Sequence, residues 1–317
     1  MPRFFWAELG AGATVPDSAQ FVTKFSRVYR AAFIGSKSPI INGKHAIWSG
    51  RRMIYGGAGV NWLGGWGSPA LVARDGTIHL VFSEEGPTIV YMRIARDVRH
   101  VTEFGGGLGG ISPTLAFGPA SALYLAYIAP VRDTPKLNAN SVFFRRSPDD
   151  GATWEPPVLV SRSGTREAHL VRMAVTPSGA IHLTWLKNLS GGYRDEVVWH
   201  TLSTDEGRTW STPRELRVAG SIPQESAVAA DSIGGVHAVF IFTGHGGPRL
   251  YYVRWHGMTA STPCVLDSGY NVLDPAMATD ERGQVQVIWN RLLHAGHGAV
   301  REMAMHATFT PPAASGK

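Results

Sequence analysis

The sequence predicts an all-β fold, a six-bladed β-propeller in which one short unit is repeated around a central channel. Three features lead to this prediction: a repeat with a spacing of about 50 residues, short apolar strands in every repeat, and turn residues between them. The 317 residues include 37 Gly and 20 Pro, as expected for many tight turns. Propellers of this length form one unit. We therefore expect a single domain over residues 1–310 and a flexible tail over residues 311–317.

Five segments share one order of elements: an inner strand, a turn, a second strand, a loop and a third strand. The inner strands open at Ser68, Ser112, Val171, Glu225 and Asp274, and the third strands open at Ile89, Val142, Glu196, Leu250 and Glu302. Four of the turns carry a glycine, at Gly76, Gly179, Gly235 and Gly283. Apolar residues alternate or run continuously in these strands, as they do in strands that are buried on both faces. Each repeat therefore predicts one four-stranded blade.

Residues 1–66 are expected to form a degenerate first blade. Its inner strand would be 29–34, its second strand 45–48 and its third strand 52–55. Together with the five clear repeats, this blade gives six. Closing the ring would remove the open sheet edges that otherwise invite aggregation.

The charge distribution favours an acidic ligand. The net charge is +6 at pH 7 and the pI is about 9.6, with 24 Arg against 6 Lys. A guanidinium binds a carboxylate or phosphate through two hydrogen bonds, whereas an ammonium acts as a point charge. No basic run of the kind that binds nucleic acid is present, and no apolar run is long enough to span a membrane. We expect no nucleic-acid partner, no membrane span and no cofactor.

Two other features bear on where the protein acts. The chain has one cysteine, Cys264, which excludes an intrachain disulfide. The first fifteen residues make a poor signal peptide, because Glu8 interrupts the apolar stretch.

Two segments, 147–154 and 203–210, fit the pattern S-x-D-x-G-x-T-W, and their first serines are 203 − 147 = 56 residues apart. Each follows the third strand of its repeat. We expect the Asp to bind backbone amides of a turn, the Gly to supply a positive φ and the Trp to pack between sheets. The pattern resembles the Asp box of the sialidase-like (neuraminidase, BNR-repeat) β-propeller superfamily. These segments are therefore expected to stabilise turns and to take no part in catalysis.

The repeat divides the predicted propeller into two ends. The Asp boxes and the turns after the inner strands lie at one end. The inner strands begin at the other end, together with the loops 130–140, 187–195, 243–249 and 290–301, which we expect to be long and irregular. Loops that vary on a constant frame are common sites of function.

The residue that opens each inner strand changes from repeat to repeat, and in two neighbouring repeats it is a carboxylate. Glu225 and Asp274 would then meet at the mouth of the channel. Glycoside hydrolysis requires two carboxyl groups, one as proton donor and one as nucleophile or base. The alternative is that each carboxylate caps a turn or pairs with a nearby arginine.

The resemblance to sialidases assigns further roles. The segment that begins Gln224-Glu225 is similar to the sialidase segment whose Glu polarises a nucleophilic Tyr, and Tyr270 is the nearest candidate for that Tyr. Tyr29-Arg30 is similar to the family's early motif, whose Arg binds the substrate carboxylate. The further candidates for binding an anion are Arg172, Arg249 and Arg291.

Histidines and tryptophans complete the set of candidates. His79, His182 and His237 recur at one position of the second strand, so we interpret them as residues of the frame. Trp62 and Trp66, in a glycine-rich segment before an inner strand, would either stack on sugar rings or pack between blades.

A second group of side chains suggests a different chemistry. His245, His294 and His297 belong to the loops at the candidate functional end, and Tyr193 or Tyr270 would lie near them. Histidine and tyrosine can act as base and acid in a polysaccharide lyase. His294 and His297 also have the spacing of metal ligands, but no third partner is evident, and we predict no metal.

Three functions therefore remain open. The first is a sialidase-like glycoside hydrolase acting on an acidic carbohydrate, with Glu225 as the leading carboxylate and Asp274 or Tyr270 as its partner. The second is a lyase acting on uronate-containing polysaccharide, and the third is a non-catalytic glycan-binding or interaction propeller. The family resemblance favours a secreted or periplasmic protein.

Overall fold

The computed structural model describes the following parts of the chain: residues 20–21, 28–32, 40–43, 46–49, 52–56, 60–61, 70–72, 77–84, 88–96, 98–104, 111–131, 140–161, 168–189, 195–268, 272–279, 283–295 and 299–310. Side chains are described from residue 77 onward, except those of residues 84, 111, 274 and 292–304.

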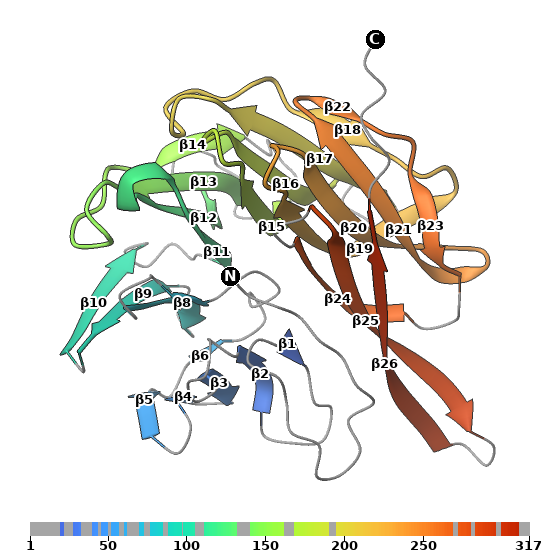
Figure 1. The fold of residues 1–317 in the computed structure, drawn as a ribbon, viewed down its shortest axis with the longest axis horizontal. Helices are drawn as coiled ribbons and strands as arrows, with labels where there is room; N and C mark the ends of the chain where they lie inside the picture. The colour runs from blue at the N-terminus through green and yellow to red at the C-terminus, as the bar shows by residue number, and fades with distance from the viewer. Residues whose placement is uncertain are drawn as a thin grey trace.

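The described strands form six antiparallel sheets in chain order (Figure 1), which we number 1 to 6. Sheet 1 contains β1 (Gln20–Phe21), β2 (Val28–Ala32), β3 (Ile40–Gly43), β4 (Ala46–Ser49) and β5 (Arg52–Gly56). Sheet 2 contains β6 (Val60–Asn61), β7 (Ala70–Val72), β8 (Ile78–Glu84), β9 (Thr88–Ala95) and β10 (Val98–Phe104). Sheet 3 contains β11 (Ile111–Phe117), β12 (Leu123–Pro130), β13 (Asn140–Ser147) and β14 (Val158–Ser161). Sheet 4 contains β15 (Ala168–Val175), β16 (Ile181–Asn188), β17 (Glu196–Ser203) and β18 (Arg214–Leu216). Sheet 5 contains β19 (Ser221–Ala230), β20 (Val236–Gly244), β21 (Gly247–His256), β22 (Thr259–Ala260) and β23 (Cys264–Asp267), and sheet 6 contains β24 (Val272–Thr279), β25 (Val285–Ala295) and β26 (Ala299–Phe309).

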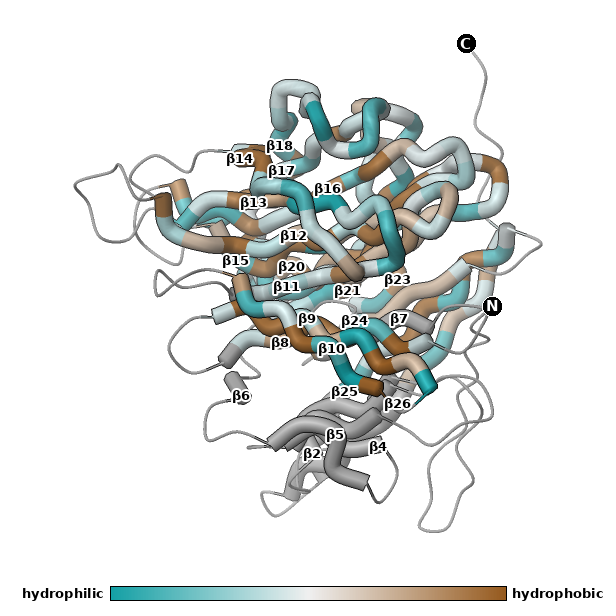
Figure 2. The backbone as a smooth tube through the Cα atoms, turned by 90° about the vertical axis from the view of Figure 1, so that its left-hand side faces the viewer, coloured by the Kyte–Doolittle hydropathy of each residue, from teal (hydrophilic) through white to brown (hydrophobic). Residues whose placement is uncertain are grey.

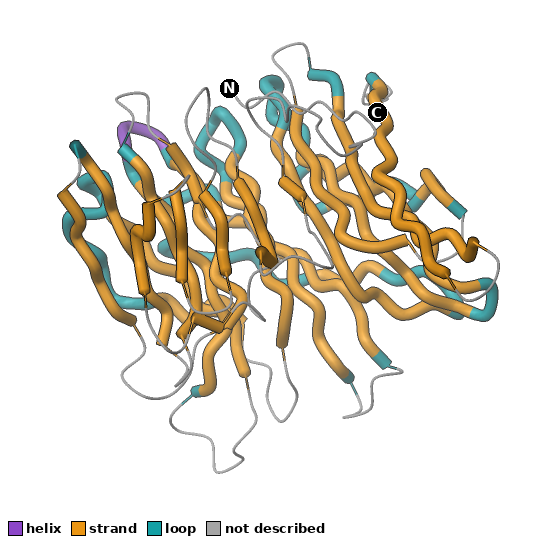
Figure 3. The backbone as a smooth tube through the Cα atoms, turned by 90° about the horizontal axis from the view of Figure 1, so that it is seen from below, coloured by secondary structure: helices purple, strands orange, loops and turns teal. Residues whose placement is uncertain are grey.

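The all-β prediction is confirmed. The described part of the chain contains only one helical element, the short 3-10 turn η2 (Pro119–Ser121), and strands run through the rest (Figure 3). No helix in the described part is long and apolar enough to cross a membrane.

The inner strands hold the sheets together at their unpaired edges. β7, β11, β15 and β19 each contact the inner strand of the next sheet, which for β19 is β24. β19 ends its sheet, so the carbonyls along its outer edge lack a strand partner. Two neighbours supply donors: Arg172 Nε of β15 donates to Ser226 O at 2.8 Å, and Thr279 Oγ1 of β24 donates to Ala230 O at 2.6 Å.

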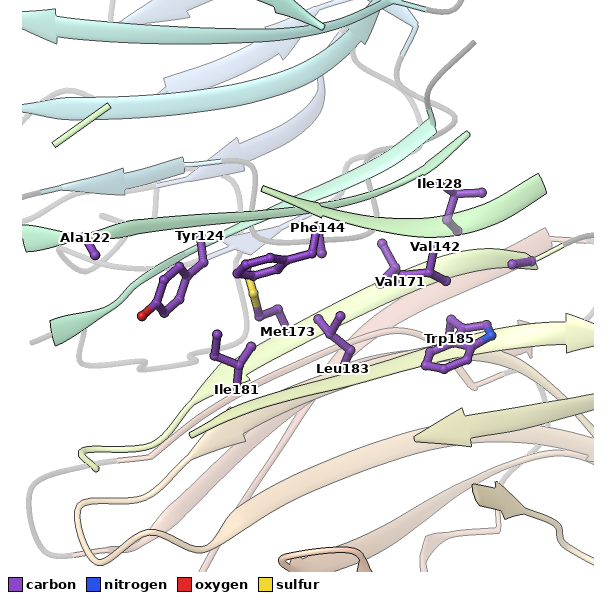
Figure 4. Packing of buried hydrophobic residues seen from close by; sticks show 12 residues of the cluster. Ala122, Tyr124, Ile128, Val142, Phe144, Val171, Met173, Ile181, Leu183 and Trp185 are labelled. Carbon is purple, nitrogen blue, oxygen red and sulfur yellow. The ribbon is translucent and has the colours of Figure 1, made fainter. Parts of the chain in front are cut away.

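The hydrophobic core lies between successive sheets. One cluster joins sheets 3 and 4, where Tyr124 and Phe144 pack against Met173, Leu183 and Trp185 (Figure 4). Similar clusters join sheets 2 and 3, sheets 4 and 5, and sheets 5 and 6. Apolar residues recur along the strands of these sheets (Figure 2), because both faces of an inner sheet are covered.

Sheet 1 differs in detail from the expected first blade. The segments predicted as strands at 29–34, 45–48 and 52–55 correspond to β2, β4 and β5. An additional strand, β3, lies between β2 and β4 in the sheet. β1 adds a fifth strand on the other side of β2.

Two of the loops expected to be long and irregular are strands instead. Within 243–249, β20 and β21 are joined by the tight turn His245–Gly246, and the Gly247 that follows has a φ of +84°. Within 290–301, β25 and β26 continue as a paired hairpin to Ala295 and from Ala299. For these two segments the prediction was wrong, because their strands stay paired to within a few residues of the turn and the glycines permit short connections.

The segments 147–154 and 203–210, called here the box turns, have the same hydrogen bonds. Asp149 Oδ1 accepts from the Thr153 amide at 2.8 Å, and Asp149 Oδ2 accepts from the Thr153 hydroxyl at 2.6 Å. The corresponding distances from Asp205 to Thr209 are 2.9 and 2.6 Å. In each turn the glycine amide donates to the first serine hydroxyl, at 2.8 and 2.9 Å. The structural role expected for both turns matches this geometry.

Each box turn also attaches to the preceding sheet. Trp154 lies edge-on to Tyr91 of sheet 2, with ring centroids 4.9 Å apart, and Trp210 lies edge-on to Phe144 of sheet 3 at 5.2 Å. Ion pairs accompany these contacts. Arg93 Nη2 lies 2.7 Å from Asp150 Oδ2, and Arg146 Nη2 lies 3.2 Å from Glu206 Oε2.

The recurring histidines are residues of the frame, as expected. Each lies buried on the second strand and pairs with an aromatic side chain of the third strand. His79 Nδ1 is 2.8 Å from Tyr91 Oη, and His237 Nδ1 is 2.7 Å from Tyr252 Oη. In sheet 4 the partner is a second histidine, with His182 Nδ1 3.0 Å from His200 Nε2. Sheet 3 has Tyr124 packed against Phe144 at these positions.

Candidate functional site

Strand direction divides the sheets into two ends. The inner and second strands are antiparallel, so the turn between them lies at the same end as the box turn after the third strand. We call this the turn end. The opposite end, where inner strands begin and second strands pass to third strands, is called the loop end. The described candidate residues of sheets 4 to 6 belong to the loop end.

A β-bulge occurs near the start of every inner strand whose register is described through this region. Relative to the second strand, β11, β15, β19 and β24 each contain one extra residue. The extra residues fall at 112–113, 170–171, 224 and 274–275. Bulges bend a strand and redirect its side chains, and they are frequent beside active sites. The position that varies between repeats therefore coincides with a bulge in each of these strands.

Glu225 lies on β19 directly after the extra residue Gln224 and opposite Ile241 of β20. Ile241 packs with Val272 and Trp289 of sheet 6. Because opposite residues of an antiparallel pair share a face, Glu225 is on the face of sheet 5 that turns towards sheet 6. Its side chain is half-buried.

Asp274 lies at the matching place on the neighbouring inner strand. The hydrogen bond from Thr279 to Ala230 fixes the two strands side by side. Asp274 precedes Thr279 by 279 − 274 = 5 residues, and Glu225 precedes Ala230 by 230 − 225 = 5 residues. Asp274 belongs to the bulge of β24 opposite Trp289. The side chain of Asp274 lies outside the described residues.

Arg172 is buried, with 4% of its surface exposed. Its Nη1 donates to the carbonyl of Val171 within its own bulge at 3.0 Å, and its Nε donates to the carbonyl of Ser226, the residue after Glu225. The structure thus places this guanidinium between two inner strands.

Arg291 is held by an ion pair at the loop end between sheets 5 and 6. Its Nη2 and Nε contact the carboxylate of Asp267 on β23, whose side chain is nearly buried. Trp289 Nε1 donates to Asp267 Oδ2 at 2.7 Å. Asp267 therefore fixes both side chains of β25 against sheet 5.

Arg249 and His245 are exposed at the loop end of sheet 5. Arg249 is opposite Phe242, which packs in the cluster between sheets 4 and 5. Arg249 is therefore on the face away from Glu225. The structure separates these two predicted site residues.

Several predicted residues have no described side chain. Arg30 lies on β2 and His294 on β25, where only the backbone is described. Tyr193, Trp62, Trp66, Tyr270 and His297 lie outside the described residues. Among the described side chains, no cluster of three or more His, Cys, Asp or Glu could hold a metal.

Sequence reasoning missed one pair of ionisable side chains at the loop end of sheet 4. His169 Nε2 lies 3.3 Å from Glu196 Oε1, with side-chain exposures of 29% and 9%. The available signal was the position of His169, just before the varying residue of its repeat. The bulge at 170–171 shifts the start of the strand by one residue relative to a simple count. The sequence therefore does not indicate which face of the sheet His169 occupies.

Comparison with known proteins places the fold. No protein-family model matches the sequence. A search of curated proteins finds no match either. Solved structures do match. A protein of unknown function from Dyadobacter fermentans has a TM-score of 0.56 and 15% identity, covering 89% of this chain and 85% of its own. A polysaccharide lyase of family PL25, an ulvan lyase bound to -[GlcA(1-4)Rha3S]-, has a TM-score of 0.55 and 12% identity, covering 79% and 70%. An α-L-arabinanase of Penicillium chrysogenum complexed with arabinobiose has a TM-score of 0.51 and 15% identity, covering 72% and 77%.

This chain has the fold of propeller-type glycan-active enzymes. At these identities the likeness concerns the fold, and function has to be argued from the site.

Proposed function

We propose that the protein is a glycan-active enzyme, a sialidase-like glycoside hydrolase that acts on an acidic carbohydrate. Glu225 is its leading carboxylate, with Asp274 or Tyr270 as partner. The observation that carries this proposal is the placement of Glu225 and Asp274 beside bulges on adjacent inner strands, at the same count from the Thr279–Ala230 hydrogen bond. A pair of carboxyl groups is what most glycosidases use.

The proposal includes a fuller description of the fold. The six sheets are taken as the six blades of one propeller domain over residues 1–310, with sheet 1 as the degenerate blade and the box turns as Asp boxes of the BNR type. The sequence of inner-strand contacts from β7 to β24 supports a ring. The matching glycan-active enzymes support an extracellular or periplasmic location.

The ligand is proposed to be anionic. Arginine outnumbers lysine fourfold, and the net charge is +6. Arg249 is exposed at the loop end, and Arg30 lies on the inner part of sheet 1, so both are kept as candidate anion contacts. Trp62, Trp66, His294 and His297 remain proposed carbohydrate contacts.

The test is turnover on a panel of sialylated, uronate-containing, sulfated and neutral glycans, with release of reducing sugar as the readout. Glu225→Gln keeps the shape and hydrogen-bonding groups but removes the ionisable carboxyl. We expect it to lower kcat at least about 100-fold, which is the usual contribution of acid–base catalysis. Glu215→Gln is the matched control, because Glu215 is exposed on the outer strand β18 and pairs only with Arg217 in the described part of the chain.

An active enzyme that is indifferent to Glu225→Gln would contradict the hydrolase proposal. Two alternatives then remain. A lyase would release an unsaturated product that absorbs in the ultraviolet, whereas a non-catalytic binding propeller would bind the glycans without turnover. In a binding protein, Glu225→Gln would weaken affinity only.

A further inference from the structure

We propose that His169 and Glu196 form a proton-transfer pair at the loop end between sheets 4 and 5, and that its substrate is a uronate-containing glycan. This site is separate from the Glu225 site, because Glu225 is on the face of sheet 5 that turns towards sheet 6. The proposal therefore adds an eliminative activity to the hydrolase function and does not depend on it.

The first step of the argument is the face on which the pair lies. His169 is opposite Leu186 on β16, and Glu196 is two residues before Val198 on β17. Leu186 and Val198 both pack in the cluster between sheets 4 and 5. Opposite residues and residues two apart on a strand share a face. Both members of the pair are therefore on the face of sheet 4 that turns towards sheet 5.

The second step is the chemistry that the pair offers. Glu196 is nearly buried, and His169 is its one ionisable partner in the described part of the chain. A carboxylate near Nε2 favours the imidazole tautomer that carries its proton there, which leaves Nδ1 as a base. Within the described residues, Nδ1 has no hydrogen-bond partner, and the imidazole is partly exposed. A neutral imidazole held in this way can accept a proton from a bound molecule.

The third step is that the fold does not require the pair. His169 is the last residue of its inner strand to pair with the second strand before the bulge. The residues in this position are Ile111 in sheet 3 and Leu273 in sheet 6. The repeats of sheets 3 and 6 therefore build the same bulge after an apolar residue. In β15 the bulge follows His169 directly, and Leu170 within it has a φ of +54°, as Ser112 has (+53°) at the matching place in β11. The positive φ therefore belongs to the repeated bulge, and the imidazole is the part that differs.

The fourth step is the class of substrate. Arg249, on the face of sheet 5 that turns towards sheet 4, is exposed and has no ion pair in the described part of the chain. A carbon–hydrogen bond next to a carboxylate becomes acidic enough for imidazole once a cation offsets the carboxylate charge. A uronate residue provides this arrangement. Nδ1 of His169 would remove the C5 proton. The electron pair of the broken C5–H bond would form the C4–C5 double bond, and the C4–O bond would break. Water would supply the proton to the departing oxygen.

The experiment uses polygalacturonate, alginate, hyaluronan and chondroitin sulfate as probes. Ultraviolet absorbance of the unsaturated product is recorded beside reducing ends. We expect the wild type to form unsaturated product, and His169→Gln to lower its rate at least about 100-fold. His169→Leu copies Leu273 of sheet 6 and serves as a second variant with a residue that the repeat accommodates. Glu196→Gln should lower the rate less than loss of the imidazole does.

Two controls separate this pair from the rest of the molecule. His306→Gln alters an imidazole near the turn end, where His306 Nε2 is 2.8 Å from Gln286 Oε1, and should leave the rate unchanged. Glu225→Gln serves to tell the two activities apart, because it is expected to lower hydrolysis. Reducing ends without unsaturation, an eliminative rate indifferent to both His169 variants, or no product from any probe would each overturn the proposal. Reducing ends that are lost in Glu225→Gln would at the same time uphold the hydrolase.

Discussion

Gly151 and Gly207 in the box turns face aromatic side chains of the preceding sheet. A Cβ added to Gly151 would lie 1.8 Å from Tyr91 Oη, and one added to Gly207 would lie 2.0 Å from Phe144 Cε1. Both residues also have a left-handed backbone, with φ of +83° and +87°. Two separate costs therefore oppose any side chain at these positions.

We predict that Gly151→Ala and Gly207→Ala destabilise the protein more than Gly234→Ala does. Gly234 has a φ of +91° but open space around it, so its substitution measures the backbone cost alone, about 1–2 kcal/mol. The box-turn variants should lose a further ~1–3 kcal/mol from overpacking. Urea unfolding of the three variants provides the measurement. Equal losses in all three would show that the contact with the preceding sheet has no cost.

His182 and His200 form a buried pair that gives stability a dependence on pH. Burial lowers the pKa of His182 to about 4. Burial, with a smaller effect from His182, lowers the pKa of His200 to about 3. The unfolded chain binds these protons at a pH near 6.5, whereas the folded protein does not. The contribution to stability is therefore full above about pH 6.5 and falls as the pH drops towards 4, by up to about 1.4 kcal/mol per pH unit for each histidine.

The variant that tests this dependence copies the neighbouring sheet. His182→Tyr with His200→Phe reproduces the Tyr124–Phe144 pair of sheet 3, which occupies the same positions and does not titrate in this range. We predict a shallower fall in the free energy of unfolding between pH 6.5 and 4 than in the wild type. Identical slopes would mean that the two histidines are not neutral in the folded protein.

Arg172 ties two inner strands together and is predicted to act through structure. Its guanidinium is buried and donates to carbonyls of Val171 and Ser226. Hydrogen bonds to a charged group contribute about 1.5–3 kcal/mol, so Arg172→Met should lower the free energy of unfolding by this order. Arg172→Lys should recover only part of the loss. The ammonium keeps the positive charge, but it lacks the planar fork of donors of a guanidinium. Arg249→Lys on the exposed face should change stability by less than about 0.5 kcal/mol.

A variant of Arg172 that keeps full stability and loses affinity for an anionic glycan would contradict this assignment. It would restore the role of Arg172 as an anion contact that the sequence suggests. Circular dichroism during urea unfolding and glycan binding by calorimetry distinguish the two outcomes.

The inner strands show what could be predicted from the sequence and what could not. The alternation of apolar residues places the second strands, and the S-x-D-x-G-x-T-W pattern predicts the hydrogen bonds of the box turns. The bulges carry no uniform pattern, because they contain Ser-Pro, Leu-Val, Gln and Asp-Pro in different repeats. A bulge changes which face a residue occupies. For this reason the pair of His169 on β15 and Glu196 on β17, which meets across the intervening strand β16, could not be predicted from spacing.

Across the molecule, the turn end is built from repeated contacts and the loop end from residues that differ between sheets. Three kinds of contact are repeated in more than one sheet. These are the box turns, their ion pairs to Arg93 and Arg146, and the buried histidines of the second strands. At the loop end the matched positions hold different residues: His169 of sheet 4 is matched by Ile111 in sheet 3 and Leu273 in sheet 6, and Glu225 of sheet 5 is matched by Asp274 in sheet 6. A constant frame with one variable end is how propellers support different chemistries.

The positive charge of the whole protein gives a prediction about ligands. The net charge of +6 and the exposed Arg249 favour acidic glycans. We predict that sulfated, uronate and sialylated glycans bind more tightly than neutral ones, and that the difference shrinks as salt is raised from about 0.05 to 0.5 M, because screening weakens exposed charge pairs. Glycan-array binding at two salt concentrations measures this. Equal binding of neutral glycans would contradict an anionic ligand.

The account depends most on the assignment of function to the loop end. The measurement that tests it directly is a crystal structure of the protein with the acidic oligosaccharide that binds best in the panel. We predict density for the sugar at the starts of the inner strands, in contact with the residues that flank the bulges of β15, β19 or β24. Density at the box turns, or on the outer strands β10, β14 and β18, would contradict the assignment and move the site to another face of the molecule.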